Sequence, residues 1–504
     1  MTAGGAQLGV VAAGHPVSAS AGADALRAGG NAVDAALGAM LASFACEPLL
    51  TGLGAGGYML VVPPGQPPVL LDFFVEAPGR GLPEGDHSEL IPVPVSFGDA
   101  VQEFHVGPAS VGTFGMPAGV CEAARRFGRL PLDRLVAPAA ALARDGVALN
   151  EQQAYIVEIL GGIVTSTPEA SALFAPAGRL LRAGERLRQP ELGDALERLG
   201  AEGARPFYEG DIAAAIVDWL ADRGGLVTWA DLAAYAVTDR RPLRVAYRGR
   251  DVLTNPPPSA GGILIARALA MLDGVAGPPS LTQLVEVMER TQRERTPEFL
   301  AGLDDPEFVA QFLARPAGRL GSTTHIAALD RDGWACSVTC SNGSASGVIV
   351  PGTGVHLNNM LGEQDLNPLG FHRHPPGRRL PSMMSPTVVL GPGPAHRAEL
   401  AVGSAGSNRI RSAVLQTIIR SVDDGLPAQQ AVEAPRVHFE DDVVYTEPGI
   451  DTAELERAGR DVVPFRARNL FFGGAQAAAR EPDGSFSGGG DPRRGGAAVV
   501  VETA

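Results

Sequence analysis

The stretch between residues 324 and 339 constrains the fold more than any other part of the chain. Apolar and polar residues alternate from Thr324 to Leu329 and again from Trp334 to Thr339. Between these runs lies Asp330-Arg331-Asp332-Gly333, and an Asp-Gly pair between alternating runs is typical of a β-hairpin turn. We therefore expect two antiparallel strands here, which excludes an all-helical fold.

This hairpin separates a helix-rich part of the chain from a strand-rich part. Helices are predicted before it after Asn31, within residues 119–160, and at Asp211–Arg223 and Ile263–Leu272. Strands are predicted after it at Thr387–Leu390, Glu399–Val402 and Ala497–Val501, with one helix near residues 410–424. Antiparallel strands with segregated helices indicate an α+β fold, in which helix layers cover the sheets.

Glycines cluster at Gly52–Gly57, after the helix that begins at Asn31 and before a predicted strand, Tyr58–Val62. A dinucleotide-binding fingerprint has the opposite order, strand, glycines and helix. We therefore expect close backbone packing here and no cofactor. The pair His372 and His374 lies in a Pro- and Arg-rich loop without cysteines nearby, so we expect no metal site either.

Composition narrows the partners of the 504-residue chain. Apolar residues make up 45% and charged residues 19%, which is typical of a folded globular protein. The net charge of −15 disfavours binding to nucleic acid or to an anionic membrane. The N-terminus lacks the basic and apolar segments of a signal peptide, and Ala32–Ala45 is too short to span a bilayer. We expect a cytoplasmic protein with no nucleic-acid or membrane partner.

One candidate nucleophile stands where the hairpin begins. A hydroxyl is a weak nucleophile at neutral pH and needs a base. The α-amine of the same residue can be that base if the residue is the first of a chain. In Gly321-Ser322-Thr323, a small, flexible pair precedes a threonine that opens a strand. A threonine at a strand start is common, so this pattern needs independent support.

That support comes from short motifs that occur in order over nearly the whole chain. They are Gly29–Ala36, Glu47-Pro48, Gly52–Leu60, Phe207–Gly210, Pro256–Gly262, Thr323-Thr324-His325, Leu357-Asn358-Asn359, Ser385-Pro386-Thr387 and Gly403-Ser404. In these motifs the chain resembles the gamma-glutamyltransferase (glutathione hydrolase) family. The resemblance implies the four-layer αββα sandwich of the N-terminal-nucleophile hydrolases, in agreement with the α+β interpretation.

The resemblance also implies that the chain is a zymogen. Autocatalytic cleavage between Ser322 and Thr323 would give a large chain, residues 1–322, and a small chain, residues 323–504, which stay associated as one intertwined unit. Thr323 Oγ would then attack a γ-glutamyl amide. The acyl-enzyme would pass its acyl group to water, an amino acid or a peptide, with glutathione as the default small-molecule substrate.

Three further residues are implied in catalysis. Ser341 matches the position of a second family hydroxyl that supports the nucleophile, with Ser where Thr is usual; Thr339 is the next candidate for this role. The backbone N–H groups of Gly406 and Ser407 would bind the oxyanion.

The glutamyl-binding residues are only partly kept. The resemblance implies that Asn342 and Glu363 hold the α-amino group and that Ser382 holds the α-carboxylate. Phe74 stands where the family has an arginine for that carboxylate, while Met360 and Met383 replace a glutamine and a serine of the family pattern. Losing a bidentate cation beside a carboxylate is a large chemical change. Either one of four arginines compensates, namely Arg80, Arg378, Arg379 or Arg409, or the acyl group is not a free γ-glutamyl group.

Three functions therefore remain open. The first is a self-processing γ-glutamyl hydrolase or transferase. The second is an amidase or acylase of the same fold that acts on another acyl group, such as a dicarboxylic side chain, and Phe74 favours it. The third is a non-catalytic paralogue, which Thr323, Ser341 and the Gly403–Ser407 turn argue against.

Overall fold

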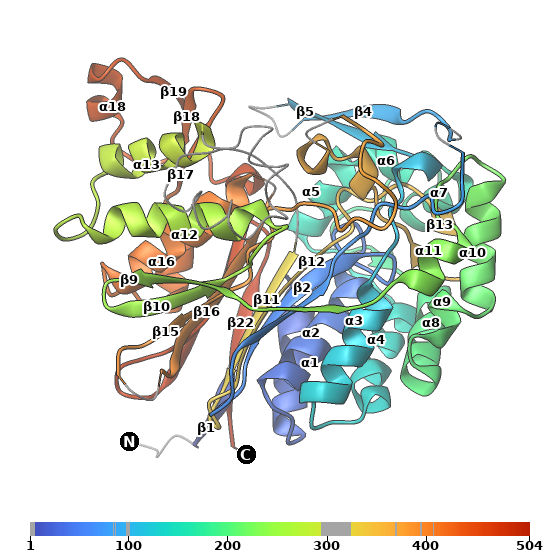
Figure 1. Cartoon of the computed structure of the whole chain (residues 1–504), viewed down its shortest axis with the longest axis horizontal. Coiled ribbons are helices and arrows are strands. Elements are labelled where there is room, and N and C mark those ends of the chain that lie inside the picture. The colour runs from blue at the N-terminus through green and yellow to red at the C-terminus, as the bar shows by residue number, and fades with distance from the viewer. Residues whose placement is uncertain are drawn as a thin grey trace.

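The computed structural model describes residues 6–503, except 84, 86, 97–100, 294–323, 368–369, 394–395 and 407. Two β-sheets lie face to face, and helices cover the outer face of each, so four layers follow one another across the molecule (Figure 1). The αββα sandwich expected from the sequence is confirmed.

The first sheet has seven strands, and neighbouring strands are antiparallel throughout. Their order is β22 (Ala497–Glu502), β1 (Gln7–Ala13), β11 (Thr324–Asp330), β12 (Ala335–Ser341), β2 (Gly56–Val62), β3 (Val69–Phe73) and β8 (Thr238–Arg240). Strands from both sides of the Ser322–Thr323 bond therefore share this sheet. The predicted hairpin is confirmed as β11 and β12, with Thr324 opposite Cys340.

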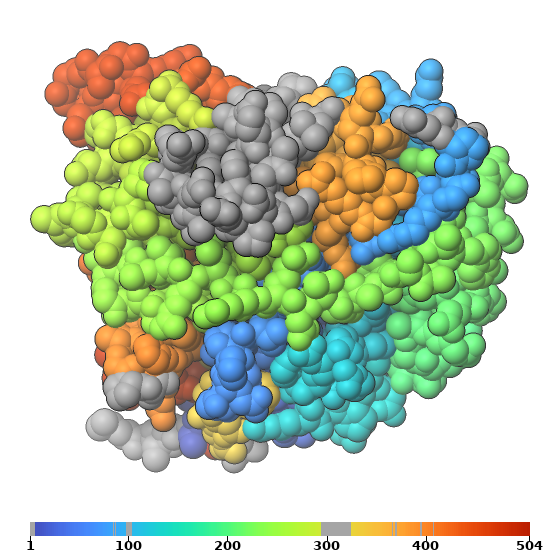
Figure 2. Space-filling model, in the orientation of Figure 1, coloured from blue at the N-terminus to red at the C-terminus, as the bar shows by residue number. Residues whose placement is uncertain are grey.

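The second sheet has six strands and is also antiparallel. Its order is β21 (Phe486–Gly490), β20 (Gly474–Arg480), β16 (Ala398–Ala405), β15 (Thr387–Leu390), β10 (Arg250–Thr254) and β9 (Leu243–Tyr247). Figure 2 shows one outer face of the molecule, and the green segment between α11 (Trp229–Ala234) and β9 crosses it from one half of the molecule to the other. This crossing takes the chain from the edge of the first sheet to the edge of the second.

Helices α1 (Pro16–Arg27) and α2 (Ala32–Cys46) pack against each other and against the first sheet. The helix α2 begins after Asn31, as the sequence predicted, and Asn31 and Asp34 form a capping box there; the helix ends at Cys46, before Glu47. Every residue of α2 is buried, so its small side chains allow close packing on both sides. Other helices of this half are α3 (Met116–Phe127), α4 (Leu132–Asp145), α5 (Glu151–Ile159), α6 (Gly161–Val164), α7 (Pro168–Phe174), α8 (Pro190–Glu202), α9 (Arg205–Tyr208) and α10 (Asp211–Ala221).

The second sheet is covered by α12 (Ala260–Asp273), α16 (Arg409–Val422) and α17 (Ala428–Glu433), with α13 (Leu281–Arg293) packed on α12. Smaller elements lie at the periphery: α18 (Ala453–Arg457), β4 (Ile91–Ser96), β5 (Val101–Val106), β6 (Val147–Ala148), β7 (Arg186–Leu187), β13 (Ile349–Val350), β14 (Val355–His356), β17 (Val437–Glu440), β18 (Val443–Thr446) and β19 (Asp461–Pro464). Within the described ranges, no helix combines the length and the apolar character needed to cross a membrane.

The glycine cluster at Gly52–Gly57, which runs into the start of β2, packs as the sequence predicted. A Cβ atom on Gly54 would lie 2.4 Å from the His356 carbonyl oxygen, and one on Gly57 would lie 2.7 Å from the Thr339 carbonyl oxygen. Both positions therefore admit only glycine, because the neighbouring backbone is too close for a side chain. No group of three or more His, Cys, Asp or Glu side chains that could hold a metal ion occurs among the described residues.

Candidate active site

The start of β11 and the end of β12 lie side by side, because Thr324 pairs with Cys340. The predicted nucleophile, Thr323, lies outside the described residues and directly precedes β11. Ser341 ends β12 and is buried, and its Oγ accepts a hydrogen bond from the Gly343 N–H at 2.8 Å. The sheet thus brings Ser341, a predicted supporting hydroxyl, to the edge from which Thr323 enters.

Glu47 lies beneath this edge and was noted in the sequence only as part of a motif. It follows the last turn of α2, is buried, and its Oε1 accepts a hydrogen bond from Thr324 Oγ1 at 3.3 Å. Burial raises the pKa of Glu47 to about 7, against the opposing effects of the Arg494 charge and the Thr324 hydroxyl. Its Oε2 has no hydrogen-bond partner among the described residues. A carboxyl group that titrates near neutral pH is a candidate for proton transfer.

The turn after β16 contains Gly406, one of the two predicted oxyanion donors. Its φ is +114°, and an added Cβ would lie 2.5 Å from the Gly473 Cα, so only glycine fits. The second predicted donor, Ser407, lies outside the described residues. The predicted turn therefore exists at Gly406, and its oxyanion role stays a prediction.

Gly406 lines a small cavity of about 50 Å³ together with the loop that follows Ser341. Gly343 and Ser344 come from that loop, and Arg409 and Arg494 supply two positive charges. The rest of the wall is mostly apolar and consists of Leu50, Phe104, Ile156, Ile159, Leu160 and Leu470. The cavity thus joins the predicted oxyanion turn to two cations and an apolar wall.

Both arginines of this cavity are buried. Arg409 donates from Nε to the Phe471 carbonyl oxygen at 2.8 Å, and its guanidinium lies 4.7 Å from the centre of the Phe471 ring. Burial lowers the pKa of Arg494 to about 10, although the nearby Glu47 opposes this shift. Sequence reasoning missed Arg494, because nothing in its spacing before the last strand sets it apart from Arg493.

The residues predicted to hold an α-amino group lie around Ser344. Glu363 Oε1 accepts hydrogen bonds from the Ser344 N–H at 3.0 Å and from Ser344 Oγ at 3.3 Å. Asn342 instead donates from Nδ2 to the His356 carbonyl oxygen at 3.3 Å and is fully buried. Asn359, which the sequence offered only as part of a motif, donates to Ser344 Oγ at 2.7 Å. Glu363 thus stands directly behind the cavity, whereas Asn342 is bonded within the loop itself.

Phe74 and Ser382 do not line this cavity. Phe74 is buried in the core between the sheets, where its ring stacks on Tyr58 with the centres 5.3 Å apart and shares a cluster with Met360. The Ser382 carbonyl accepts from the Ala260 N–H at 2.8 Å, at the start of α12. In this structure both residues therefore serve packing, and their contact with a substrate stays a prediction.

The structure separates the four arginines that were expected to replace the missing cation. Arg379 is held by Asp72 and Glu76, with N–O distances of 3.3 and 3.4 Å. Arg80 pairs with Asp231 at 3.2 Å and with Glu76 at 3.3 Å. Of the four, Arg409 is the one among the described lining residues of the cavity.

A four-layer αββα sandwich with a threonine before a central strand and a glycine turn opposite it defines the class of N-terminal-nucleophile hydrolases. Comparison with known proteins agrees with this class. The family described as Gamma-glutamyltranspeptidase matches residues 18–501. The chain therefore belongs to the gamma-glutamyltranspeptidase family and is an enzyme of the N-terminal-nucleophile class, as the sequence motifs indicated.

Three similar proteins fall into two groups by name, acylases and a glutathione hydrolase. The chain is 31% identical to the "Acylase ACY 1 proenzyme" of Pseudomonas sp. (strain SE83), covering 98% of this chain and 93% of that one. It is also 31% identical to the "Glutathione hydrolase proenzyme" of Escherichia coli (strain K12), covering 97% and 91%. The solved cephalosporin acylase from Bacillus halodurans superposes with a TM-score of 0.84 at 27% identity, covering 99% and 97%. Equal identity to both groups does not assign the acyl group.

Proposed function

We propose that the chain is a proenzyme that cuts its own backbone between Ser322 and Thr323 and then forms an acyl-enzyme on Thr323. Three observations support this. Thr323 directly precedes β11, Ser341 ends the neighbouring strand, and the glycine turn at Gly406 follows the end of β16 in the facing sheet. The two relatives above are both named proenzymes. The large chain would be residues 1–322 and the small chain residues 323–504.

In the proposed reaction, the α-amine of Thr323 takes the proton of its own hydroxyl as Oγ attacks the amide carbonyl. The resulting oxyanion accepts hydrogen bonds from the backbone N–H groups at Gly406 and Ser407. A donor of this kind typically stabilises the transition state by about 3–4 kcal/mol. The leaving amine takes the proton from the α-ammonium group, and water or an amino acid then attacks the ester and frees Thr323.

The choice of acyl group rests on one observation, the position of Arg409 and Arg494 in the cavity lining. Two buried guanidinium groups line the cavity beside Gly406, and they favour an acyl group that ends in a carboxylate. We propose a γ-glutamyl amide as the acyl donor, with glutathione as the default substrate, because Glu363 stands behind Ser344 where an α-amino group needs an acid.

A dicarboxylic acyl group without the α-amino group is the second candidate. Among the described residues, the lining of the cavity includes two arginines and no carboxylate. Phe74 and Met360 are buried among apolar side chains. They offer no hydrogen-bonding groups for the α-amino and α-carboxylate groups of a glutamyl substrate. A glutaryl group would use the same arginines and would not need Glu363.

Rates with γ-glutamyl-p-nitroanilide and glutaryl-p-nitroanilide separate the two candidates. We expect a higher kcat/KM for the γ-glutamyl compound and a loss of that preference in Glu363→Gln. Equal or faster turnover of the glutaryl compound by the unaltered enzyme would replace the γ-glutamyl proposal with the acylase. Absence of turnover with either compound would contradict both.

A further inference from the structure

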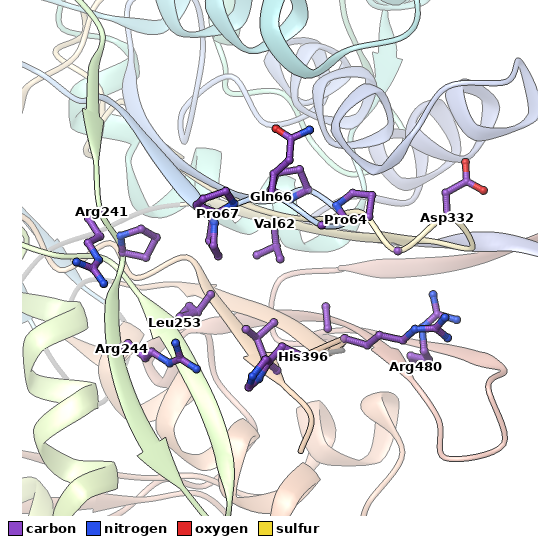
Figure 3. A pocket seen from close by; sticks show the side chains of 18 of the residues that line it. Val62, Pro64, Gln66, Pro67, Arg241, Arg244, Leu253, Asp332, His396 and Arg480 are labelled. Carbon is purple, nitrogen blue, oxygen red and sulfur yellow. The ribbon is translucent and has the colours of Figure 1, made fainter. Parts of the chain in front are cut away.

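A second, larger cavity opens at the other end of the sandwich. Its volume is about 760 Å³, and it lies between the two sheets, where β2 ends at Val62 and β16 begins at Ala398 (Figure 3). From Ala398 to Gly406, β16 spans the full sheet, a length of about 25 Å at ~3.3 Å per residue. The open cleft is therefore remote from the proposed active site and takes no part in the reaction described above.

The cleft is strongly positive although the chain as a whole is acidic. Five arginines contribute to its lining: Arg241, Arg244, Arg331, Arg397 and Arg480. Among the described residues of the lining, one is a carboxylate, Asp332, which pairs with Arg129 outside the lining at 2.7 Å. Arg244 pairs with Asp251, which lies outside the lining, and Arg331 Nε lies 4.0 Å from Asp332 Oδ1. Within the described part of the chain, the guanidinium groups left without a carboxylate partner are therefore those of Arg241, Arg397 and Arg480. In a chain with a net charge of −15, these three groups form a local field of the opposite sign.

Two of these arginines lack a partner in the part of the chain that the structure describes. The guanidinium groups of Arg241 and Arg397 make no hydrogen bond or ion pair with any residue that the structure describes. The neighbour Arg240, by contrast, pairs with Asp72 at 2.6 Å on the other side of the segment. Arg241 thus faces the cleft although its immediate neighbour takes part in a buried ion pair.

Arg480 brings a third positive charge whose partners are neutral. Its Nη2 donates to the Asp330 carbonyl oxygen at 2.7 Å, and its guanidinium lies 4.3 Å from the centre of the Phe486 ring. Burial, and next the positive charge of Arg397, lower the pKa of Arg480. The two cations therefore stand close enough to repel each other, and a bound anion would relieve this repulsion.

The walls between these charges are stiff. Proline residues at positions 63, 64, 67 and 68 build the turn from β2 to β3, and Pro242 follows Arg241. Buried Leu253, Leu390 and Ala398 line the cleft where the sheets meet. Figure 3 shows Arg241 and Arg480 at opposite ends of the cleft, with Arg244 and His396 between them. Arginines that come from separate segments are thus held around one hollow.

From this arrangement we propose that the cleft is a binding site for a small polyanion that carries phosphate or carboxylate groups. Guanidinium groups bind both kinds of oxyanion through paired, charge-assisted hydrogen bonds. Arg241, Arg397 and Arg480 are the residues that would hold the anion. This site is independent of the proposed acyl transfer, and its ligand does not enter that reaction.

Isothermal titration of the full chain with sodium tripolyphosphate and, separately, with citrate tests the proposal. We expect saturable binding of at least one of them at one site per chain, weakening as NaCl is raised. Binding of tripolyphosphate alone would assign the ligand to phosphates, and binding of citrate alone to carboxylates. The double variant Arg241→Ala/Arg397→Ala should bind more weakly, with a dissociation constant about a hundredfold higher.

A matched control removes the same charge elsewhere. Arg134→Ala/Arg457→Ala takes two exposed arginines from α4 and α18, neither of which lines the cleft, and should leave binding unchanged. Thermal unfolding of both double variants checks that they are folded. The proposal is overturned if neither anion binds at millimolar concentration, or if the two double variants bind equally well.

Discussion

The two ends of the sandwich differ in how deeply their charged side chains are buried. At the end where β11 begins, Glu47 is buried against Thr324, and the buried Arg409 and Arg494 line a cavity of about 50 Å³. At the other end, Arg241 and Arg397 are exposed beside a cleft of about 760 Å³. Burying a charge costs free energy because the group loses its hydration, and such groups cluster at functional sites. An exposed charge keeps its hydration and costs little. Substitutions should therefore have large effects at the first end and small ones at the second.

The largest effect after loss of the nucleophile is expected for Gly406→Ala. A Cβ there meets the Gly473 backbone at 2.5 Å, so the turn must move and its N–H loses its direction. Loss of one oxyanion donor typically lowers kcat by about 10²–10³-fold. Steady-state kinetics with the preferred p-nitroanilide measures this.

Gly425→Ala is the matched control for that substitution. Gly425 also has a positive φ, +65°, but an added Cβ would meet nothing within 4 Å. We expect a small loss of stability there with kcat unchanged. Equal kcat losses in the two variants would mean that Gly406 acts only through general backbone strain.

Arg494→Ala and Arg409→Ala should mainly raise KM. Each removes one buried positive charge from the cavity beside Gly406, and a charge-assisted hydrogen bond contributes about 1.5–3 kcal/mol, which corresponds to roughly 10–100-fold. The loss should be seen with acyl groups that end in a carboxylate and be much smaller with butyryl-p-nitroanilide. A similar loss for both substrates would show that the arginines do not contact the carboxylate.

Glu47→Gln should change the pH dependence of stability. The pKa of Glu47 in the folded chain is about 7, above its usual value of 4.5, so the folded state binds the proton more tightly than the unfolded state. The free energy of unfolding therefore falls as pH rises from 4.5 to about 7, by up to about 3 kcal/mol, and levels off above 7.

In Glu47→Gln the side chain stays neutral, so Tm should fall less between pH 5 and pH 8 than in the unaltered chain. Differential scanning calorimetry at these two values measures the difference. Parallel pH dependences in the two proteins would exclude Glu47 as the titrating group.

The smallest effect is expected at the open end. Without added polyanion, Arg241→Ala/Arg397→Ala should change the free energy of unfolding by less than about 0.5 kcal/mol per residue, because neither guanidinium has a partner in the described structure. Chemical denaturation measures this. A larger destabilisation would show that these arginines stabilise the fold and would weaken the contrast between the two ends.

Local sequence patterns predicted the helices and strands better than they predicted the residues that line the cavity beside Gly406. The helix start at Asn31 and the Asp-Gly turn at residues 332–333 depend on a few neighbouring residues, so both were predicted as they occur in the fold. The resemblance also implied roles for Ser341 and Gly406 from their positions relative to the motifs at Thr323 and Gly403, and these roles stay predictions.

The contributions of Arg494, Glu47 and Arg241 could not be predicted in this way. Glu47 meets Thr324 across 277 positions of sequence, and only the packing of α2 under the first sheet brings them together. Arg494 lines the same cavity as Gly406 because it stands just before β22, which returns to pair with β1. The arginines of the open cleft come from separate segments, so no single motif could show that they converge.

Mass spectrometry of the purified, denatured chain tests the central claim most directly. The account predicts two polypeptides, one ending at Ser322 and one beginning at Thr323, together with a single uncut polypeptide in Thr323→Ala. Incubation with the preferred substrate followed by acid quenching should add the mass of one acyl group to the smaller polypeptide. An uncut and active unaltered chain, or a cut at another position, would contradict the claim that Thr323 becomes an N-terminal nucleophile.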